Sequence, residues 1–201
     1  MSTSTSVSTD KKSSLRSTNP VRWLTITAIF MGLNIIVSSF GIPVPGGHLY
    51  LCDTIICTAA LLLDPVAAFI VGGIGSFLGD LLFYPAPMFV SLVTHGLQAA
   101  VVSIIAHRAV RNRSARAHFS LSLIATLIGG VIMVVGYTLG KIYIYSTYVD
   151  AVLKLPYEIA QALLGVIGSL LLCFKGGLNR IFARMEYNEV GVKNTLSPHQ
   201  K

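Results

Sequence analysis

Polar side chains recur at helical spacing within long apolar stretches of this sequence. They form four stripes, whose members are Ser76 and Asp80; Ser91, His95 and Gln98; Tyr137, Lys141, Tyr145 and Tyr148; and Lys154, Glu158 and Gln161. Residues three or four apart share one face of a helix. A polar group within a membrane is costly without a partner, so such stripes mark function by default. Stripes that converge at one depth predict a cavity for a small polar solute.

Three of the stripes also have an interpretation that involves no ligand. Lys141 lies near the end of its apolar stretch, where its side chain could extend to lipid headgroups. Lys154 and Glu158 could form an ordinary ion pair between positions i and i+4 of one helix. His95 and Gln98 could serve only to join helices by hydrogen bonds. Spacing alone leaves these alternatives open.

Asp80 and a group of tyrosines lie near the same depth. The tyrosines within 143–148 are more typical of an aromatic belt at a membrane interface than of a binding platform. Asp80 is harder to explain without function, because a carboxylate near the end of an apolar run needs a partner. Lys141, His95 or a ligand could be that partner.

The composition is that of a membrane protein. Of 201 residues, 53% are hydrophobic and only 11% are charged, and the mean hydropathy is +0.71, whereas soluble domains carry about 25% charged residues. Six apolar segments are present, namely Trp23–Phe40, Leu49–Leu63, Pro65–Phe83, Pro87–His107, Phe119–Tyr145 and Ala151–Ile181. The second is short for a membrane span and the last two are long. We therefore predict an all-α membrane protein whose domain, residues 20–184, is a bundle of six transmembrane helices.

Basic residues gather in three groups at the ends of these segments. The groups are Lys11, Lys12, Arg16 and Arg22; Arg108, Arg111, Arg113 and Arg116; and Lys175, Arg180, Arg184, Lys193 and Lys201. The positive-inside rule places all three groups in the cytoplasm, and six crossings satisfy it, so both termini are predicted to be cytoplasmic. A re-entrant hairpin over 49–83 would leave four crossings and satisfy the rule equally. The outer face then contains 41–48, 84–86 and 146–155.

The two ends of the chain have a different composition. Residues 1–19 are rich in Ser and Thr and lack apolar periodicity, which predicts a disordered cytoplasmic tail, and 185–201 are predicted to be a second tail. A signal peptide is the competing interpretation of the start. The run 23–40 is long enough to span a membrane, and no A-x-A-like cleavage site follows it, which favours a retained helix. Within the bundle, Asp64 and Pro65 are predicted to cap the third segment.

Several motifs of other protein classes are missing. The sequence contains no GxxxxGK[ST] phosphate loop, no HExxH metal site and no nucleophile elbow around Ser76. Cys52, Cys57 and Cys173 form no CxxC pair and have no His at zinc-finger spacing, so neither a disulfide nor a metal site is indicated. The net charge is +7, but the basic residues lie in short segments between apolar runs. They therefore do not indicate nucleic-acid binding. We predict a protein that is not an enzyme and holds no cofactor or metal.

Small residues form smooth helix faces in the first and third segments. Ala28 and Gly32 are four apart, and Gly72, Gly73, Ser76 and Gly79 follow in the third segment. Such faces let another helix approach closely. Spacing does not decide whether Ala28 and Gly32 pack within the bundle or against another polypeptide.

Several blocks of this sequence resemble one family in order and spacing. They are LCD at 51–53, AALLLDPVAA at 59–68, GGIGS at 72–76, GDLL at 79–82, THGLQ at 94–98, GY at 136–137 and LPYEIAQ at 155–161. Together they resemble the substrate-binding membrane subunit, or S component, of energy-coupling factor (ECF) vitamin transporters, over roughly 22–182.

The resemblance implies how such a subunit works. It implies a multi-pass protein of the bacterial plasma membrane, with six helices, that binds a vitamin from outside. Its partners would be a membrane scaffold protein and two ATP-binding subunits, which hydrolyse ATP. In that family a small-xxx-small motif of the first helix packs on the scaffold, and Ala28 and Gly32 match it. A solitary secondary carrier and an intramembrane enzyme are the competing classes.

The residues of the stripes suggest a substrate. Lys141 would suit a carboxylate, and Gln, His and Tyr side chains would suit hydroxyl and amide groups, which together describe pantothenate. In this hypothesis the outer loop around His48 and Asp53 closes over the solute. The substrate-binding residues are predicted to be Asp53, Asp80, His95, Gln98, Lys141, Tyr145, Glu158 and Gln161.

Other vitamins remain alternatives. Pyridoxine, hydroxymethylpyrimidine and thiamine are alternative substrates. A neutral or cationic vitamin that pairs with Asp80 and Glu158 also remains open. Folate is less favoured, because a pterin ring needs stacking surface and the sequence has a single Trp, Trp23.

Overall fold

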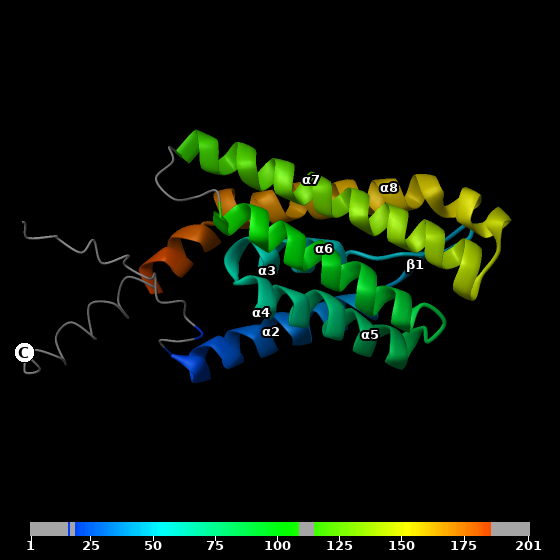
Figure 1. Cartoon of the computed structure of the whole chain (residues 1–201), viewed down its shortest axis with the longest axis horizontal. Coiled ribbons are helices and arrows are strands. Elements are labelled where there is room, and N and C mark those ends of the chain that lie inside the picture. The colour runs from blue at the N-terminus through cyan, green and yellow to red at the C-terminus, as the bar shows by residue number, and fades with distance from the viewer. Residues whose placement is uncertain (1–15, 17–18, 109–114, 186–201) are drawn as a thin grey trace, which may run out of the picture.

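The fold is a bundle of helices that run along one long axis (Figure 1). The computed structural model describes residue 16 and residues 19–108 and 115–185. In chain order the elements are α2 Pro20–Ser38, β1 Ile42–Val44, β2 Gly47–Leu49, α3 Cys52–Leu62, α4 Pro65–Phe69, η1 Ile70–Ile74, α5 Gly75–Phe83, α6 Met88–Arg108, α7 Ala115–Gly140, η2 Lys141–Tyr145, α8 Tyr148–Leu170 and η3 Leu171–Lys175. Residues 178–185 are also helical. The predicted tails lie almost entirely outside the described residues.

Five helices of the described chain are long and apolar enough to cross a membrane. They are Pro20–Ser38, Pro65–Phe83, Met88–His107, Ala117–Tyr145 and Tyr148–Lys175. The second apolar segment forms the shorter helix α3, of 11 residues, and the last two spans have 29 and 28 residues. The expectation of one short and two long segments is therefore confirmed. At about 1.5 Å per residue, α3 covers only about half the thickness of a bilayer core.

Capping residues fix where the helices near the basic end begin. The Asn19 side chain accepts a hydrogen bond from the Arg22 amide, and α2 starts at Pro20. Asp64 accepts from the amides of Val66 and Ala67, so the predicted cap before Pro65 is confirmed. The Trp23 indole also donates to Asp64, which ties the start of α2 to the start of α4.

Three of the long spans contain a π-helical turn. The turns η1, η2 and η3 lie within or at the end of spans that are otherwise α-helical. At η1 the Asn34 amide donates to the Val71 carbonyl at 2.8 Å and to Ser76 Oγ at 3.1 Å. Side-chain contacts of this kind support a local change of helix type, and such turns are common at functional sites.

A small β-hairpin follows α2, which the all-α prediction did not include. Strands β1 and β2 are antiparallel, and Pro43 pairs with His48 in their register. Gly46, with φ of 79°, forms part of the turn between them. A Cβ at Gly46 would lie 2.7 Å from the Asp150 carbonyl oxygen and 3.1 Å from Lys154 Cβ. The hairpin therefore lies directly against the first turns of α8.

The core lies where α3 packs between α6 and α8. Ile56, Ala59 and Ala60 of α3 are completely buried. The small residues of the third span pack internally, since a Cβ on Gly72 would lie 2.6 Å from the His95 carbonyl oxygen. Large hydrophobic side chains cover much of the outer surface, as expected for a protein in lipid.

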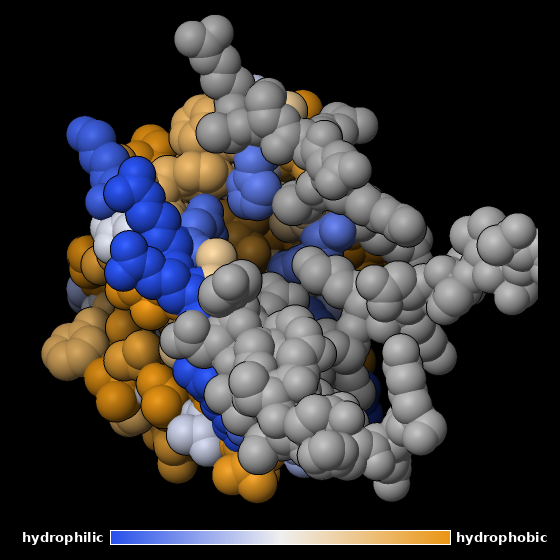
Figure 2. Space-filling model, turned by 90° about the vertical axis from the view of Figure 1, so that its left-hand side faces the viewer, coloured by the Kyte–Doolittle hydropathy of each residue, from blue (hydrophilic) through white to orange (hydrophobic). Residues whose placement is uncertain are grey.

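The two ends of the bundle differ in charge. Arg16, Arg22, Lys175, Arg180 and Arg184 belong to the segments at the left-hand end in Figure 1. Figure 2 views this end and shows hydrophilic residues next to the hydrophobic sides. The hairpin lies toward the opposite end (Figure 1).

Candidate functional site

One polar cavity lies in the half of the bundle that the hairpin covers. It is lined by Ser38, Gly47, His48, Tyr50, Cys52, Ser76, Asp80, Tyr84, Pro87, His95, Met133, Tyr137, Lys141, Tyr145, Lys154, Glu158 and Gln161. Its space between atoms is about 540 Å³, including solvent at the mouth. The room that it leaves for water-sized solutes is only about 30 Å³ in this conformation, well below the roughly 300–1,000 Å³ of occupied ligand pockets. The cavity therefore has the polar lining of a small-molecule site but is contracted in this conformation.

Lys141 is buried in the wall of this cavity, with 3% of its surface exposed. Its Nζ lies 3.4 Å from the Gly46 carbonyl oxygen of the hairpin and 5.0 Å from the centre of the Tyr145 ring. The side chain therefore points into the bundle and does not extend to lipid headgroups. Its ammonium group contacts a carbonyl and a ring, which leaves donor capacity toward the cavity.

The turn η2 explains why Lys141 and Tyr145 point the same way. Four residues of an α-helix advance slightly more than one turn, and four residues of the wider π turn advance slightly less. The two deviations oppose each other, so Tyr137, Lys141 and Tyr145 all line the cavity. Tyr143 and Tyr148 are 79% and 67% exposed, as expected for an aromatic belt. Tyr148 therefore does not continue the stripe into the cavity.

Lys154 and Glu158 form the expected i, i+4 pair and also line the cavity. Lys154 Nζ is 3.9 Å from Glu158 Oε1 and 5.9 Å from the centre of the Tyr137 ring. Thr138 donates to Glu158 Oε2 at 3.3 Å. Glu158 Oε1 is buried and has no hydrogen-bond partner within the described chain. A buried oxygen without a hydrogen-bond partner, on a residue that lines a cavity, is suited to accept a hydrogen bond from a ligand.

Asp80 has a different partner from those expected. Ser91 Oγ donates to its carboxylate, and the Tyr137 hydroxyl is within hydrogen-bond distance of the same Ser91 oxygen. Because Ser91 has one hydroxyl proton and gives it to Asp80, Tyr137 donates in turn to Ser91. This chain joins α5, α6 and α7 in one wall of the cavity. The expected ion pair of Asp80 with Lys141 or His95 is not present among the described residues.

Asp53 and Gln98 lie in a second layer beneath the cavity. Asp53, in the first turn of α3, is 1% exposed and accepts from Gln98 Nε2 at 2.8 Å and from Gln161 Nε2 at 2.6 Å. Gln161 Oε1 accepts from the Tyr50 amide at 2.9 Å. The prediction that Asp53 belongs to the outer closing loop is therefore wrong. Asp53 instead anchors α3 and the end of the hairpin to α6 and α8.

His95 is held by the same network. Its Nδ1 lies 2.7 Å from Gln98 Oε1 and 3.8 Å from Asp53 Oδ1, and its side chain is 2% exposed. Its ring centre is 5.2 Å from that of Tyr137. Hydrogen bonding within the protein, one of the two alternatives for His95 and Gln98, is thus present. His95 in addition lines the cavity.

Aromatic rings form much of the cavity wall. Besides His95, Tyr137 and Tyr145, the wall contains His48, Tyr50 and Tyr84. The His48 ring lies 6.1 Å from that of Tyr50 and 5.6 Å from that of Tyr84. Burial, and to a smaller extent the negative charge of Asp80, raises the pKa of the Tyr50 phenol. This hydroxyl therefore stays a donor at neutral pH. His48 Nδ1 is buried without a hydrogen-bond partner among the described residues.

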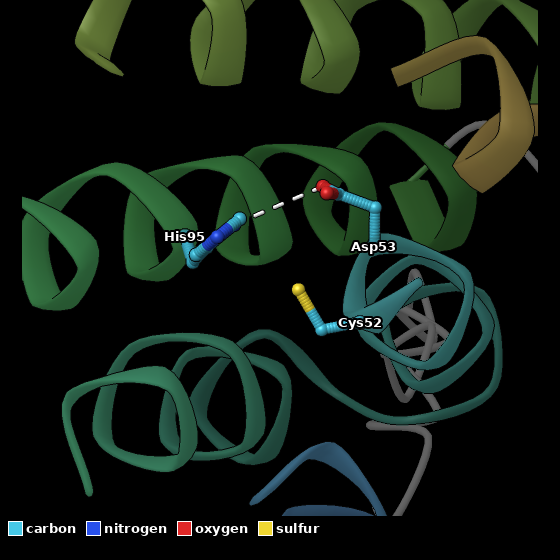
Figure 3. Close-up of side chains that lie close together, drawn as sticks. All are labelled: Cys52, Asp53 and His95. Carbon is cyan, nitrogen blue, oxygen red and sulfur yellow. Dashed lines mark ion pairs between the residues drawn. The ribbon is translucent and has the colours of Figure 1, made fainter. Parts of the chain in front are cut away.

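Sequence reasoning missed Tyr50, Tyr84 and Cys52 as lining residues. Tyr50 and Tyr84 lie at the ends of elements, where no helical period marks which way a side chain points. Cys52 begins α3, and the sequence shows it only as part of an apolar run. In Figure 3 its Sγ lies near Asp53 and His95, which come from α3 and α6. One ligand atom of each lies within 4.8 Å of the others, although Asp53 and His95 are 42 positions apart in the sequence.

Ala28 and Gly32 lie away from this site, on the outer side of α2. Ala28 is exposed, and a Cβ added at Gly32 would meet no atom within 4 Å. Of the α2 span, 17% is buried within the chain. The two residues therefore do not pack within the bundle, and their face is open to the surroundings.

Comparison with known proteins identifies the family. Residues 18–176 match the family model described as ECF-type riboflavin transporter, S component. A protein of Pyrococcus woesei, described as "Uncharacterized protein in gap 3'region", is 30% identical over 128 residues, which cover 63% of this chain and 81% of that relative. The expected resemblance to S components is confirmed. The chain belongs to the family of ECF-type riboflavin transporter S components, which are multi-pass membrane subunits that bind the transported substrate.

Proposed function

We propose that this chain captures a vitamin from the extracellular side in the cavity beneath the hairpin. The observation that carries the proposal is the concentration of buried polar side chains around one cavity in an otherwise apolar bundle. Lys141, Glu158 and Gln161 are 3%, 1% and 5% exposed, and all three line it. Such groups are costly in a membrane unless a partner or a ligand satisfies them.

Riboflavin is the substrate that the cavity supports best. Four tyrosines and two histidines line the wall, which supplies stacking surface for a planar ring. Counting tryptophans underestimates this surface, because Tyr and His rings provide it here. Lys141 can donate to ring carbonyl oxygens, and Glu158 Oε1 can accept from a ring N–H or a hydroxyl group. The printed name of the matched family points the same way.

Pantothenate is a second candidate, and Lys141 is the observation that favours it. The nearest contacts of Lys141 are a carbonyl oxygen and an aromatic ring. A buried ammonium group that forms no ion pair within the described part of the chain would gain from an anionic ligand. Pantothenate offers one carboxylate, together with hydroxyl and amide groups for His95, Tyr145 and Gln161. Asp53 and Gln98 would support either ligand from the layer beneath.

The hairpin is the element that closes the site in this proposal. It contributes Gly47 and His48 to the cavity wall and its Gly46 carbonyl to Lys141. A ligand held by Lys141 would thus lie directly beneath the hairpin. Opening and closing of the hairpin would then control entry and release.

The chain would deliver its vitamin as part of a larger complex in a bacterial plasma membrane. The basic end places both termini in the cytoplasm if α3 counts as the sixth crossing, and the cavity then opens outward. The open face of Ala28 and Gly32 would pack on a membrane scaffold protein. Two ATP-binding subunits would supply the energy by hydrolysing ATP.

Paired substitutions at Lys141 distinguish the two vitamins. Lys141→Gln keeps a hydrogen-bond donor and removes the charge, whereas Lys141→Ala removes both. Riboflavin binding, followed by the change in flavin fluorescence of the purified chain in detergent, is expected to survive Lys141→Gln and to weaken in Lys141→Ala. If pantothenate is the substrate, calorimetry will show tight binding that both variants weaken. Binding of neither vitamin by the unaltered chain would contradict both candidates.

A further inference from the structure

We propose that Cys52, Asp53 and His95 form a binding site for a divalent transition-metal ion of the zinc class. The thiol sulfur, a carboxylate oxygen and a ring nitrogen of these residues lie within 4.8 Å of one another. The side chains are 4%, 1% and 2% exposed. Figure 3 shows them converging from α3 and α6 on one point.

The donor set suits zinc. Thiolate, imidazole and carboxylate are the three ligand types that Zn²⁺ takes in proteins, at bond lengths of about 2.0–2.3 Å. Ligands of a tetrahedral ion lie roughly 3–4 Å apart at such bond lengths. A contraction of the cluster by at most about 1–2 Å would therefore seat the ion. Three protein ligands leave one position open, as in zinc sites that bind water or a substrate.

The burial of the charged Asp53 side chain is a second, independent observation that favours a bound cation. Its carboxylate is almost completely buried, and its two hydrogen-bond donors are the neutral amides of Gln98 and Gln161. The single basic group within 4.0 Å of it in the described chain is His95, at 3.8 Å. A buried carboxylate without a firm cationic partner is costly. A divalent ion would supply the missing positive charge.

The surrounding side chains resemble the outer shell of a metal site. Gln98 Oε1 accepts from the His95 Nδ1–H, which leaves His95 Nε2 as the nitrogen that would bind the ion, and Gln98 Nε2 donates to Asp53 Oδ1. Gln98 thus orients two of the three ligands at once. Gln161 holds the other oxygen of Asp53. Outer-shell hydrogen bonds of this kind fix metal ligands in place and raise affinity. Binding of the ion would convert the Cys52 thiol to a thiolate and release its proton to solvent.

The open coordination position faces the cavity, because Cys52 and His95 line its wall. Water would fill that position in the empty protein. A carbonyl or hydroxyl oxygen of the solute could replace the water, and this last step rests on the proposed vitamin site. The metal site itself does not depend on it.

Cobalt is a suitable probe because Co²⁺ occupies zinc sites and reports its ligands by absorption. The full chain, stripped of metal in detergent, is expected to bind one equivalent of Co²⁺ with a thiolate-to-cobalt charge-transfer band, which Zn²⁺ abolishes. Cys52→Ser should remove the band. Cys173→Ser is the matched control, because Cys173 is also buried but lies outside the cluster. Asp53→Asn and His95→Gln should each weaken Co²⁺ binding at least tenfold.

The outcomes separate a metal site from a purely hydrogen-bonded network. A missing band, or the same band in Cys52→Ser, would overturn the metal site. Thermal unfolding of each variant without metal identifies any that fail to fold, and Cys52→Ser changes a single atom. Riboflavin titrations with and without Zn²⁺ complete the test. Vitamin binding without the cobalt band would reject the metal site alone, and the band without vitamin binding would reject the proposed function alone.

Discussion

Two lysines lie in the cavity wall, whereas the other described cations belong to segments at the opposite end of the bundle. Lys141 and Lys154 are 3% and 7% exposed, and the carboxylate nearest to Lys154 is its i+4 neighbour Glu158. Lys141 has a carbonyl and a ring as its nearest contacts. Of the two, Lys141 is therefore the one with more to gain from a ligand.

Lys141→Ala is expected to weaken vitamin binding at least tenfold. A hydrogen bond from a charged donor contributes about 1.5–3 kcal/mol, and tenfold in affinity corresponds to about 1.4 kcal/mol. Lys175→Ala is the matched control, because Lys175 is exposed and belongs to the basic end. Isothermal titration of both variants measures the effect. Equal affinities for the two variants would remove Lys141 from the site.

Most of the candidate residues could be predicted from the sequence, because residues three or four apart share one face of a helix. Asp80, His95, Lys141 and Glu158 line the cavity that their spacing predicts. Helical spacing shows which residues share a face of a helix. It does not show whether a side chain lines the cavity or lies beneath it. Gln98 therefore lies beneath the cavity although it shares a face with His95. Cys52 carries no signal at all, because the sequence shows it only as part of an apolar run.

At the scale of elements, the sequence predicts the long helices but not the hairpin. Apolar runs identify the long spans because hydrocarbon requires about 20 apolar residues. Strands β1 and β2 have three residues each, too few for a period of two to appear. The π-helical turn η2 could not be predicted from the sequence either, because helix type depends on packing. Its effect is visible in Tyr145, which lines the cavity together with Lys141.

Gly46→Ala is expected to disturb closure of the hairpin. Gly46 has φ of 79°, and a Cβ there would lie 2.7 Å from the Asp150 carbonyl oxygen, which is backbone and cannot move easily. The vitamin should dissociate faster, with a loss of affinity of about tenfold. Gly177→Ala is the matched control, because Gly177 has φ of 74° and open space around it. Equal dissociation rates in the two variants would show that the hairpin does not hold the ligand.

Gly72→Ala is expected to lower stability through the contact of the third span with α6. The added Cβ would lie 2.6 Å from the His95 carbonyl oxygen and 2.8 Å from Ala99 Cβ. Overpacking of this kind typically costs about 1–3 kcal/mol. Gly32→Ala, where a Cβ meets no atom within 4 Å, should leave stability unchanged or slightly raised. The thermal midpoint in detergent distinguishes the two, and an unchanged midpoint for Gly72→Ala would contradict the packing described.

At the scale of the whole molecule, binding and transport are expected to use different surfaces. The cavity lies inside the bundle, whereas Ala28 and Gly32 lie on the outer side of α2. Ala28→Trp and Gly32→Leu should leave vitamin binding by the isolated chain intact and abolish uptake by cells that also contain the scaffold and ATP-binding subunits. Loss of binding would instead show that this face matters within the chain. Transport by the chain alone in liposomes would indicate a solitary carrier.

A binding titration of the purified, unaltered chain decides whether the cavity is a vitamin site. Riboflavin is titrated by flavin fluorescence and calorimetry, with pantothenate, pyridoxine, thiamine and folate as comparators. We expect saturable one-to-one binding of riboflavin in the nanomolar range, which corresponds to a binding free energy of about −12 kcal/mol. Tight binding of pantothenate instead would retain the vitamin site and replace the substrate. If no vitamin in this panel binds to folded protein, the assignment of the cavity as a vitamin site is contradicted.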